Sequence, residues 1–328
     1  MVLILTEPQL RRCIGVNHEA LDAVADGFNR LAAGQATMPP IMRLDVAEHN
    51  GEVDVKTAYL QGLDGFAVKL SSGFFNNHKL GLPSLSGLMI LLSARTGFPQ
   101  ALLLDNGYLT DVRTGMAGAL AARHLAPEQV STAGVIGAGA QARYQMRALQ
   151  LVRDFKRVLV YSRTPQNTRQ YAEEMAASLE RPVEPVASAE AVVRHSDVVV
   201  TTTPAKDPYL RAEWLHPGLH ITAMGSDAEE KQELHPDVFR RAGLIVCDRK
   251  SQALRLGELH HAHDAGALPS QDQIIELGQL TSGELAGRQS SEQITICDLT
   301  GTGVQDTAIA LLAYHKAREL GLGQQIDA

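Results

Sequence analysis

The sequence predicts an α/β protein that combines a doubly wound parallel sheet with an α+β domain. Two observations lead to this fold class. Beyond residue 126, short apolar runs alternate with helix-like stretches, starting at the glycine-rich segment GVIGAGAQARYQ at 134–145, and such alternation is typical of parallel sheets covered by helices. Between Arg43 and Ser93, short alternating runs are separated by turn residues such as Asn50-Gly51, which indicates a mostly antiparallel sheet.

Helices are expected around both sheets. Apolar residues at spacings of three and four predict a helix over 18–33, and the Ala-rich stretch 109–126 predicts a long helix that links two domains. A last helix at about 305–320 is expected to return to the leading domain. We therefore predict one domain of residues 1–115 with 305–328, and a second domain of residues 116–304. A chain of 328 residues can hold two separate cores.

The composition narrows the class of partner. A net charge of −7 gives no electrostatic reason to expect nucleic acid or an anionic membrane. The three cysteines, Cys13, Cys247 and Cys297, are far apart and odd in number, which argues against a disulfide framework and fits core packing in a reducing cytoplasm. No stretch is apolar and long enough to span a bilayer, and the first residues do not resemble a signal peptide. We expect a cytoplasmic protein.

The glycine-rich segment predicts a Rossmann-type dinucleotide site. Gly137 would allow a tight turn, Gly139 a close approach of the backbone to a pyrophosphate, and Ala142 close packing of the following helix. A lone motif of this kind is weak, because glycines also mark ordinary turns. Here a strand pattern precedes it, a helix pattern follows, and a second strand comes about twenty residues later.

The end of that second strand bears on which dinucleotide is bound. An NAD site usually has an acidic residue there, whereas this chain has Tyr161, Ser162, Arg163 and Thr164. An arginine and two hydroxyls suit a 2′-phosphate, so we predict that NADP(H) is favoured over NAD(H). The alternative is that Thr164 caps the next helix and Arg163 is a solvated surface residue.

Four motifs in order, LTDVRTGMAGALAARHL, VIGAGAQA, MGSDAEEKQELHPDV and GTGVQDTAIA, resemble the ornithine cyclodeaminase/mu-crystallin family over essentially the whole chain. Within that family the chain looks most similar to the cyclodeaminase-type proteins of ectoine-utilisation operons. The resemblance implies a homodimer whose leading half forms a substrate-binding and dimerisation sheet, followed by a Rossmann domain.

The resemblance also implies site residues. The family's carboxylate-binding cations correspond to Arg43, Lys69 and Arg113, and its catalytic residues to Asp227 and Lys69. Surface ion pairs are the common alternative for the cations, but Lys69 lies within an apolar run, where an unpaired ammonium would be costly. For Asp227 the alternative is a turn or helix cap. The family pattern D-x-x-G-K is broken, because Glu230 stands before Lys231 in place of glycine.

Lys56 bears on the substrate side chain. It stands two residues after Asp54, so the two side chains share one strand face. A lysine here would repel the side-chain ammonium of ornithine and attract a second anionic group. A salt bridge to an acid across the sheet is an equally reasonable interpretation.

The three histidines of HHAH, His260, His261 and His263, lack the cysteine or acid spacing of a metal site, and we expect no metal. Substrate binding is assigned to Arg43, Lys56, Lys69 and Arg113. Cofactor binding is assigned to a larger set: Thr114, Gly137, Gly139, Ala140, Gln141, Ser162, Arg163, Thr164, Thr202, Met224, Lys231 and Thr300.

The predicted function is NAD(P)-dependent redox chemistry at the α-carbon of a small amino or imino acid. Ketimine reduction, or turnover of an ectoine-pathway intermediate, is preferred. The alternatives are cyclodeamination of ornithine to proline and ammonia, and a non-enzymatic protein that binds NADPH and small ligands, like the crystallin branch.

Overall fold

The computed structural model describes residues 1–327. The chain divides into two compact units, one formed by Met1–Arg113 with the segment from Thr302 onward, the other by Thr114–Gly301. The predicted Ala-rich helix is α3 (Tyr108–Leu125), and the boundary between the two units at Arg113 and Thr114 falls within it. In the part of the chain described, no helix combines the length and the apolar character needed to cross a membrane.

The first unit is built on one sheet with the strand order β16-β1-β7-β6-β5-β4-β2, with β3 also paired to β4. Neighbouring strands are antiparallel except for the parallel pair β1 and β7. The expected antiparallel sheet is therefore confirmed. Its strands are β1 (Val2–Thr6), β2 (Ala36–Thr37), β3 (Met42–Val46), β4 (Gly51–Leu60), β5 (Gly65–Phe74), β6 (Leu85–Ser93), β7 (Pro99–Leu104) and β16 (Gln324–Ile326).

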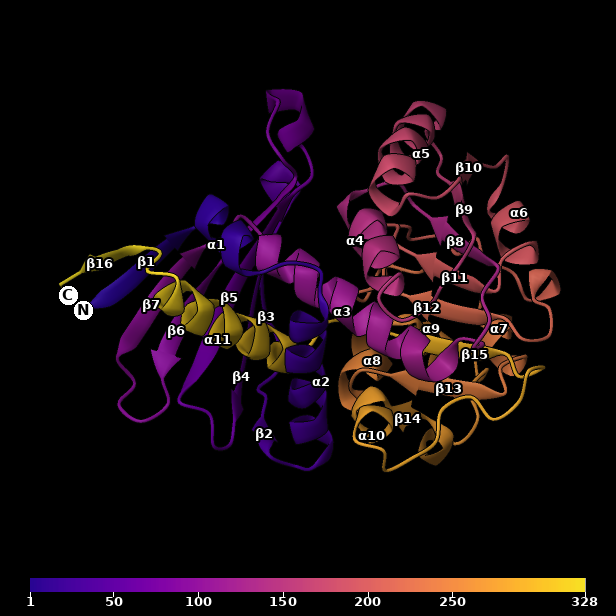
Figure 1. The fold of residues 1–328 in the computed structure, drawn as a ribbon. Coiled ribbons are helices and arrows are strands. Elements are labelled where there is room, and N and C mark those ends of the chain that lie inside the picture. The colour runs from indigo at the N-terminus through magenta and orange to yellow at the C-terminus, as the bar shows by residue number, and fades with distance from the viewer. Residues whose placement is uncertain (328) are drawn as a thin grey trace. The chain divides into compact units, whose positions relative to one another are not determined.

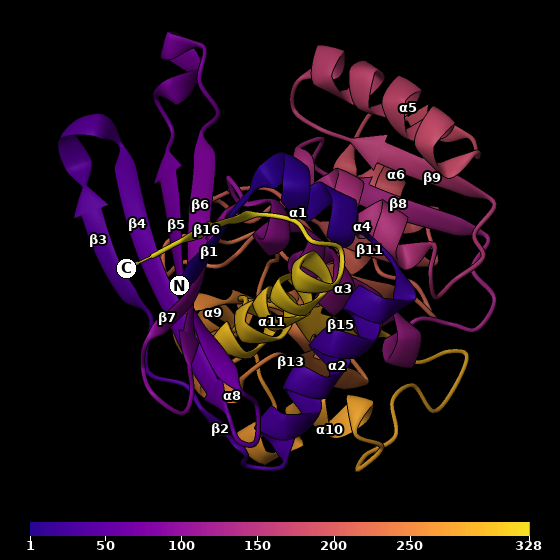
Figure 2. The same ribbon diagram turned by 60° about the vertical axis from the view of Figure 1, so that its left-hand side comes forward.

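Three helices lie beside this sheet (Figure 2): α1 (Glu7–Cys13), α2 (His18–Ala32) and α11 (Gly303–Glu319). Asn17 caps α2, since its side chain accepts a hydrogen bond from the Ala20 amide at 2.9 Å. Helix α2 buries its apolar stripe, including Phe28, while α11 packs on α2, β4 and β5. Short 3₁₀ turns stand at Ala47–His49 and at Asn77–Leu80, the latter in the β5–β6 connection.

The second unit is an entirely parallel sheet with the order β10-β9-β8-β11-β12-β15-β13-β14. The order runs outward from β8 in both directions, as in a doubly wound fold. The predicted fold class is confirmed. The strands are β8 (Thr132–Ile136), β9 (Arg157–Tyr161), β10 (Val183–Pro185), β11 (Val198–Thr201), β12 (His220–Ala223), β13 (Leu244–Cys247), β14 (Ile275–Glu276) and β15 (Thr295–Asp298).

Alternate side chains of these strands belong to two hydrophobic clusters. Val198 and Val200 of β11 pack in one cluster and Val199 in the other, because successive strand residues point to opposite faces. All three cysteines are buried and free, as expected. The helices, visible in Figure 1, are α4 (Ala140–Leu149), α5 (Pro165–Leu179), α6 (Ala189–Arg194), α7 (Asp237–Arg240), α8 (Lys250–Leu256), α9 (Glu258–Asp264) and α10 (Leu277–Thr281), with 3₁₀ turns at Ala212–Trp214 and Gln271–Gln273.

Candidate active site

The glycine loop forms a tight turn between β8 and α4. Gly137 has a φ of +114°, and a Cβ added there would meet Thr202 Oγ1 at 2.3 Å, so only glycine fits. Gly139 is the N-cap residue of α4, and nothing lies within 4 Å of where its Cβ would be. The space beside Gly139 and the first turn of α4 therefore suit a pyrophosphate held by helix amides.

A cavity of about 650 Å³ opens beside this loop. Its lining includes Gly137 and Gly139, the end of β9 at Ser162 and Arg163, and Thr202 after β11. These positions follow the carboxyl ends of strands around β8, where the strand order reverses, which is where open α/β sheets bind ligands. The residues present therefore fit a dinucleotide.

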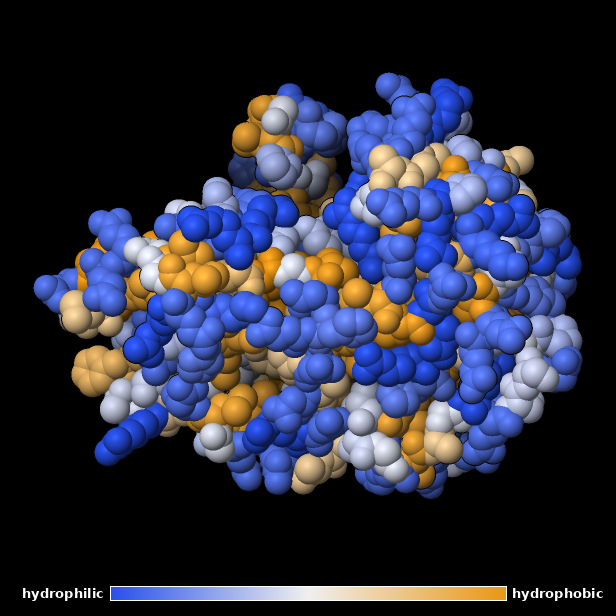
Figure 3. Space-filling view, in the orientation of Figure 1, coloured by the Kyte–Doolittle hydropathy of each residue, from blue (hydrophilic) through white to orange (hydrophobic). Residues whose placement is uncertain are grey.

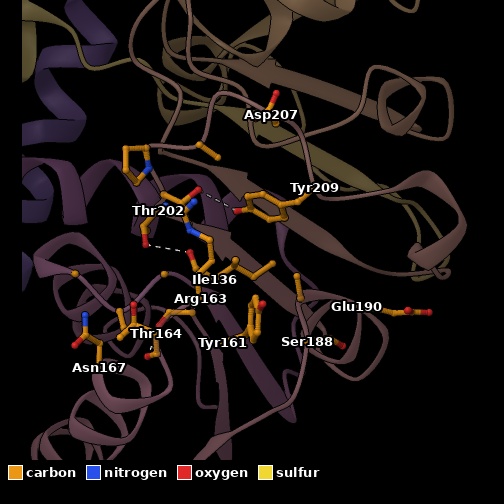
Figure 4. Close-up of a pocket in the computed structure, with 18 of the residues that line it drawn as sticks. Ile136, Tyr161, Arg163, Thr164, Asn167, Ser188, Glu190, Thr202, Asp207 and Tyr209 are labelled. Atoms are coloured by element: carbon orange, nitrogen blue, oxygen red, sulfur yellow. Dashed lines mark hydrogen bonds between the residues drawn. The ribbon is translucent and has the colours of Figure 1, made fainter.

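The side chains at the end of β9 contain no acid (Figure 4). Arg163 is exposed on the cavity wall close to Thr164 and Asn167. Thr164 is the N-cap residue of α5, but its side chain makes no capping hydrogen bond. Ser162 Oγ instead lies 2.7 Å from Thr168 Oγ1. Thr164 therefore does not cap α5 with its side chain. The cavity lining also includes two carboxylates, those of Glu190 and Asp207.

Asp227 lies in the loop that follows β12. Its side chain is 47% exposed and its Oδ1 accepts a hydrogen bond from Lys231 Nζ at 2.7 Å. His261, one of the three histidines of HHAH, holds the same loop, with Nε2 at 2.9 Å from the Lys231 carbonyl oxygen. Glu230 is not among the non-glycine residues with positive φ, which are Asn50, Asn106 and Glu180. The loop therefore has no conformational need for the family glycine at position 230.

Glu233 anchors this loop, and the sequence reasoning missed it. Its fully buried carboxylate accepts hydrogen bonds from Thr201 Oγ1 at 2.6 Å, from the Thr203 amide at 2.7 Å and from the Gly225 amide at 2.9 Å. It also accepts from the hydroxyl of Tyr209 at 2.8 Å. One side chain thus ties the chain after β11 to the chain after β12. The only signal in the sequence was a lone glutamate in the ELHPDV stretch.

The other predicted cofactor residues have varied surroundings. Ala140 and Gln141 stand in the first turn of α4. Thr114 and Met224 are buried. The Thr300 hydroxyl accepts from Gln252 Nε2 at 2.8 Å and donates to Asp248 Oδ1 at 3.0 Å, so it is already engaged within this unit.

In the first unit, the structure brings three buried cations together. Lys56 and Lys69 are cross-strand partners on β4 and β5, and both are buried. Lys69 Nζ lies 3.0 Å from Asp306 Oδ2, and Arg113 Nε lies 3.0 Å from Asp306 Oδ1. Arg113 Nη1 also donates to Gln305 Oε1 at 2.7 Å. We call Lys56, Lys69, Arg113 and Asp306 the cation cluster.

In the cation cluster, burial and the neighbouring charges shift the pKa values of Lys69 and Asp306 in opposing directions. Burial, together with the charge of Arg113, lowers the pKa of Lys69 to about 7, although Asp306 acts in the opposite direction. Burial alone would raise the pKa of Asp306, but Arg113 and Lys69 outweigh it and hold that pKa below its usual value. A further negative charge beside Lys69 would therefore act in the same direction as Asp306 and raise the pKa of Lys69.

Arg43 stands apart from the cation cluster. It pairs in register with Asp54 on β4, but its guanidinium binds Asp45 Oδ1 at 3.0 Å and the carboxylate of Glu52. This is the ion-pair alternative for Arg43, at an exposed position. Asp54 shares the sheet face of Lys56, as predicted, and its Oδ1 is buried without a hydrogen-bond partner.

No group of three or more His, Cys, Asp or Glu side chains is arranged to hold a metal ion within residues 1–327. His260 and His263 lie near Asp264 in α9, with Nδ1 atoms 3.9 Å and 3.3 Å from its carboxylate oxygens.

Known proteins match this chain end to end. A protein of Rhizobium meliloti (strain 1021) that is named as a dehydrogenase is 50% identical over 325 residues, which are 99% of this chain and 98% of that one. The structure of Thermococcus litoralis Δ1-pyrroline-2-carboxylate reductase with NADH and L-proline has a TM-score of 0.94 and 32% identity, covering 99% of this chain and all of that one.

Two further solved structures are similar over the same length. An archaeal alanine dehydrogenase dimer with bound NAD has a TM-score of 0.92 and 35% identity, covering 99% of both chains. The iminosuccinate reductase of Paracoccus denitrificans with NAD⁺ has a TM-score of 0.91 and 30% identity, covering 100% of this chain and 99% of that one. The prediction that the chain is an enzyme is confirmed, because these relatives are named as dehydrogenases or reductases and the solved ones hold NAD(H).

The family model for these proteins matches residues 3–321. The chain belongs to the ornithine cyclodeaminase/mu-crystallin family.

Proposed function

We propose that this enzyme is an NAD(P)-dependent reductase of a small α-imino acid, and in the reverse direction a dehydrogenase of the amino acid. The observation that carries the proposal is the cation cluster, in which two buried cations, Lys69 and Arg113, share the buried carboxylate of Asp306. The names of the solved relatives, which act on small amino or imino acids, support the same class of reaction.

The cation cluster is our candidate site for the substrate α-carboxylate. Lys69 and Arg113 offer charge-assisted donors, and a guanidinium can bind a carboxylate through two parallel hydrogen bonds. The pKa of Lys69 is lowered to about 7, and the negative charge of a substrate carboxylate beside it would favour the charged form of the lysine. We therefore assign substrate binding to the unit that contains β4, β5 and α11, and cofactor binding to Thr114–Gly301.

Asp227 is our candidate proton donor. When bound, the nicotinamide supplies the hydride that the imine carbon accepts. The imine nitrogen must then take a proton, and Asp227 is a half-exposed carboxyl whose orientation Lys231 fixes at 2.7 Å. Asp227 would deliver a proton that it has taken from solvent or from the Lys231 ammonium, or would hold a water molecule that delivers it. The Glu233 network fixes the loop backbone at Gly225, two residues away.

NADP(H) is our preferred cofactor. The support is the end of β9, where Arg163 lines the cavity beside hydroxyl groups and the position usual for an acidic residue in NAD sites carries none. The solved relatives contain NAD(H), so the proposed preference for NADP(H) rests on the residues of this chain alone.

A homodimer is supported by the sheet of the first unit. The fully buried side chains of its strands, such as Ala58, Ala67 and Leu91, belong to the face that α11 covers. The residues between them point to the opposite face of the sheet. Val55 and Ile90 there are apolar yet only half-buried, and Met42 and Leu44, which pair with that face of β4, are about 60% exposed. Further exposed leucines follow the 3₁₀ turn of the β5–β6 connection, whose projecting end is partly orange in Figure 3.

The finer choice of substrate rests on Lys56. A buried lysine beside Lys69 disfavours ornithine, whose second ammonium it would repel, and favours a substrate with a neutral or anionic side chain. Ornithine cyclodeamination is therefore the second candidate. A substrate from ectoine utilisation stays a prediction.

The test is a screen of NADPH and NADH oxidation by the purified enzyme against cyclic and acyclic α-imino acids, with ornithine plus NAD⁺ as the comparison. We expect reduction of at least one imino acid with a kcat/KM well above that for ornithine. Equal or better conversion of ornithine to proline with recycled NAD⁺ would overturn the preference. Binding of NADPH without turnover of any imino acid would overturn the proposed reaction.

A further inference from the structure

The first turn of α11 is docked on the sheet by two contacts that leave little freedom. A Cβ at Gly303 would meet the carbonyl oxygen of Thr57 at 2.4 Å, so glycine permits the helix start to approach β4. Thr307 Oγ1 donates to the Ala58 carbonyl at 2.7 Å and accepts from the Ala67 amide at 3.0 Å. These contacts fix α11 against both β4 and β5.

The residues between those two contacts face the cations. Asp306 is fully buried, and its Oδ1 accepts a hydrogen bond from Lys69 Nζ at 3.1 Å. The same carboxylate is the ion-pair partner of Arg113. Gln305, also fully buried, accepts from Arg113 Nη1. A buried ammonium without a counter-charge costs several kcal/mol, so the carboxylate of Asp306 stabilises the charged forms of Lys69 and Arg113 in addition to suiting the first turn of α11.

We propose that Asp306 and Gln305 are positioning residues: Asp306 keeps Lys69 charged and aligned for the substrate carboxylate, and Gln305 fixes the guanidinium of Arg113. This inference rests on the proposed function, because it takes Lys69 and Arg113 as the carboxylate ligands. Neither α11 residue needs to contact the substrate.

The charged groups around Lys69 make the idea testable by titration. Lys69 faces Lys56 on β4, Arg113 on α3, Asp306 on α11 and, at the end of β7, the buried Asp105. Both cations lower the pKa of Lys69, whereas Asp306 raises it. Removing the charge of Asp306 should therefore lower that pKa further, by at least about one unit.

The first experiment measures the Lys69 pKa by NMR in protein labelled with ¹³C at the lysine ε-carbon. Asp306→Asn should lower it by at least one unit, while Asp22→Asn, which removes an exposed acid from α2, should leave it unchanged. An unchanged pKa in Asp306→Asn would overturn the role of Asp306. This readout needs no substrate, so it stands apart from the proposed reaction, whose failure would appear in wild-type turnover.

The second experiment uses kinetics with the best imino acid from the screen. In Asp306→Asn the alkaline limb of kcat/KM should move to lower pH by the same amount, with NADPH affinity unchanged. A loss that is equal at every pH would show a merely structural role. If Asp306→Asn does not fold, Gln305→Met tests the account: it should raise KM about tenfold with kcat and the pH profile intact, and an unchanged KM would contradict it.

Discussion

The glycine-loop cavity and the cation cluster are built in different ways. The cavity depends on backbone: the left-handed Gly137, the open space at Gly139 and the first turn of α4 follow one another in the chain. The cation cluster depends on side chains that are far apart in sequence, since Lys69 and Asp306 meet across 237 positions. A local site can be recognised from a motif, whereas a long-range site depends on strand register and helix docking.

The largest effect that separates the two regions is expected at Asp227. Asp227→Asn should lower kcat by about 10² to 10⁴, the usual worth of a general acid, while NADPH still binds with nearly wild-type affinity. Steady-state kinetics and fluorescence titration measure the two quantities. Glu229→Gln, an exposed acid in the same loop, is the matched control and should be almost silent. A parallel loss of turnover and binding in Asp227→Asn would contradict the role of proton donor.

The backbone character of the cavity is tested by an alanine at each loop glycine. Gly137→Ala should destabilise the unit and lower the melting temperature, because φ is +114° and the Cβ would clash with Thr202. Gly139→Ala meets open space, so it should melt like the wild type but bind NADPH at least about tenfold more weakly by crowding the pyrophosphate. Gly139→Ala with full NADPH affinity would exclude this position from the cofactor site.

Arg163 tests which dinucleotide the cavity selects. Arg163→Ala removes a charge-assisted contact worth about 1.5–3 kcal/mol, so NADPH binding should weaken roughly ten- to a hundredfold. NADH binding should hardly change. Titration of both cofactors into both proteins gives the answer. A wild type that prefers NADH, or a variant that loses both cofactors alike, would mean that Arg163 is only a surface residue.

The smallest expected effect is the pH dependence of the cation cluster. The pKa of Lys69 is lowered to about 7 from 10.5, so Lys69 is charged below that pH and neutral above it. Affinity for a non-reactive α-keto acid should therefore fall as pH rises through 7, by at most about tenfold per unit. Lys69→Met should bind the α-keto acid more weakly, and its affinity should not fall as pH rises through 7. A wild-type affinity that is flat from pH 6 to pH 9 would contradict this account.

The sequence predicted the parallel sheet and the glycine loop because their signals are local. Gly137 and the strands around it can be recognised within a dozen residues. The short strand β1 was not predicted, because both of its partners are distant in sequence: β7 begins at Pro99, and β16 lies at the other end of the chain.

The candidate substrate site was only partly predictable. Lys69 was predicted as a site residue because it is a lysine within an apolar run. Nothing in the local sequence indicates that Asp306 is its partner or that Gln305 accepts a hydrogen bond from Arg113. Arg43 was expected with these cations, yet its side chain binds Glu52 and Asp45. Glu233 was missed for the same reason, since its partners lie in two other loops.

The central claim is that the cation cluster selects substrates by their α-carboxylate. The most direct measurement compares kcat/KM for a cyclic α-imino acid with that for the same cyclic imine without its carboxylate, at saturating NADPH. The account predicts a preference of at least about 10³-fold for the carboxylated compound, because two buried charge-assisted contacts are lost together. Equal values for the two imines would contradict it.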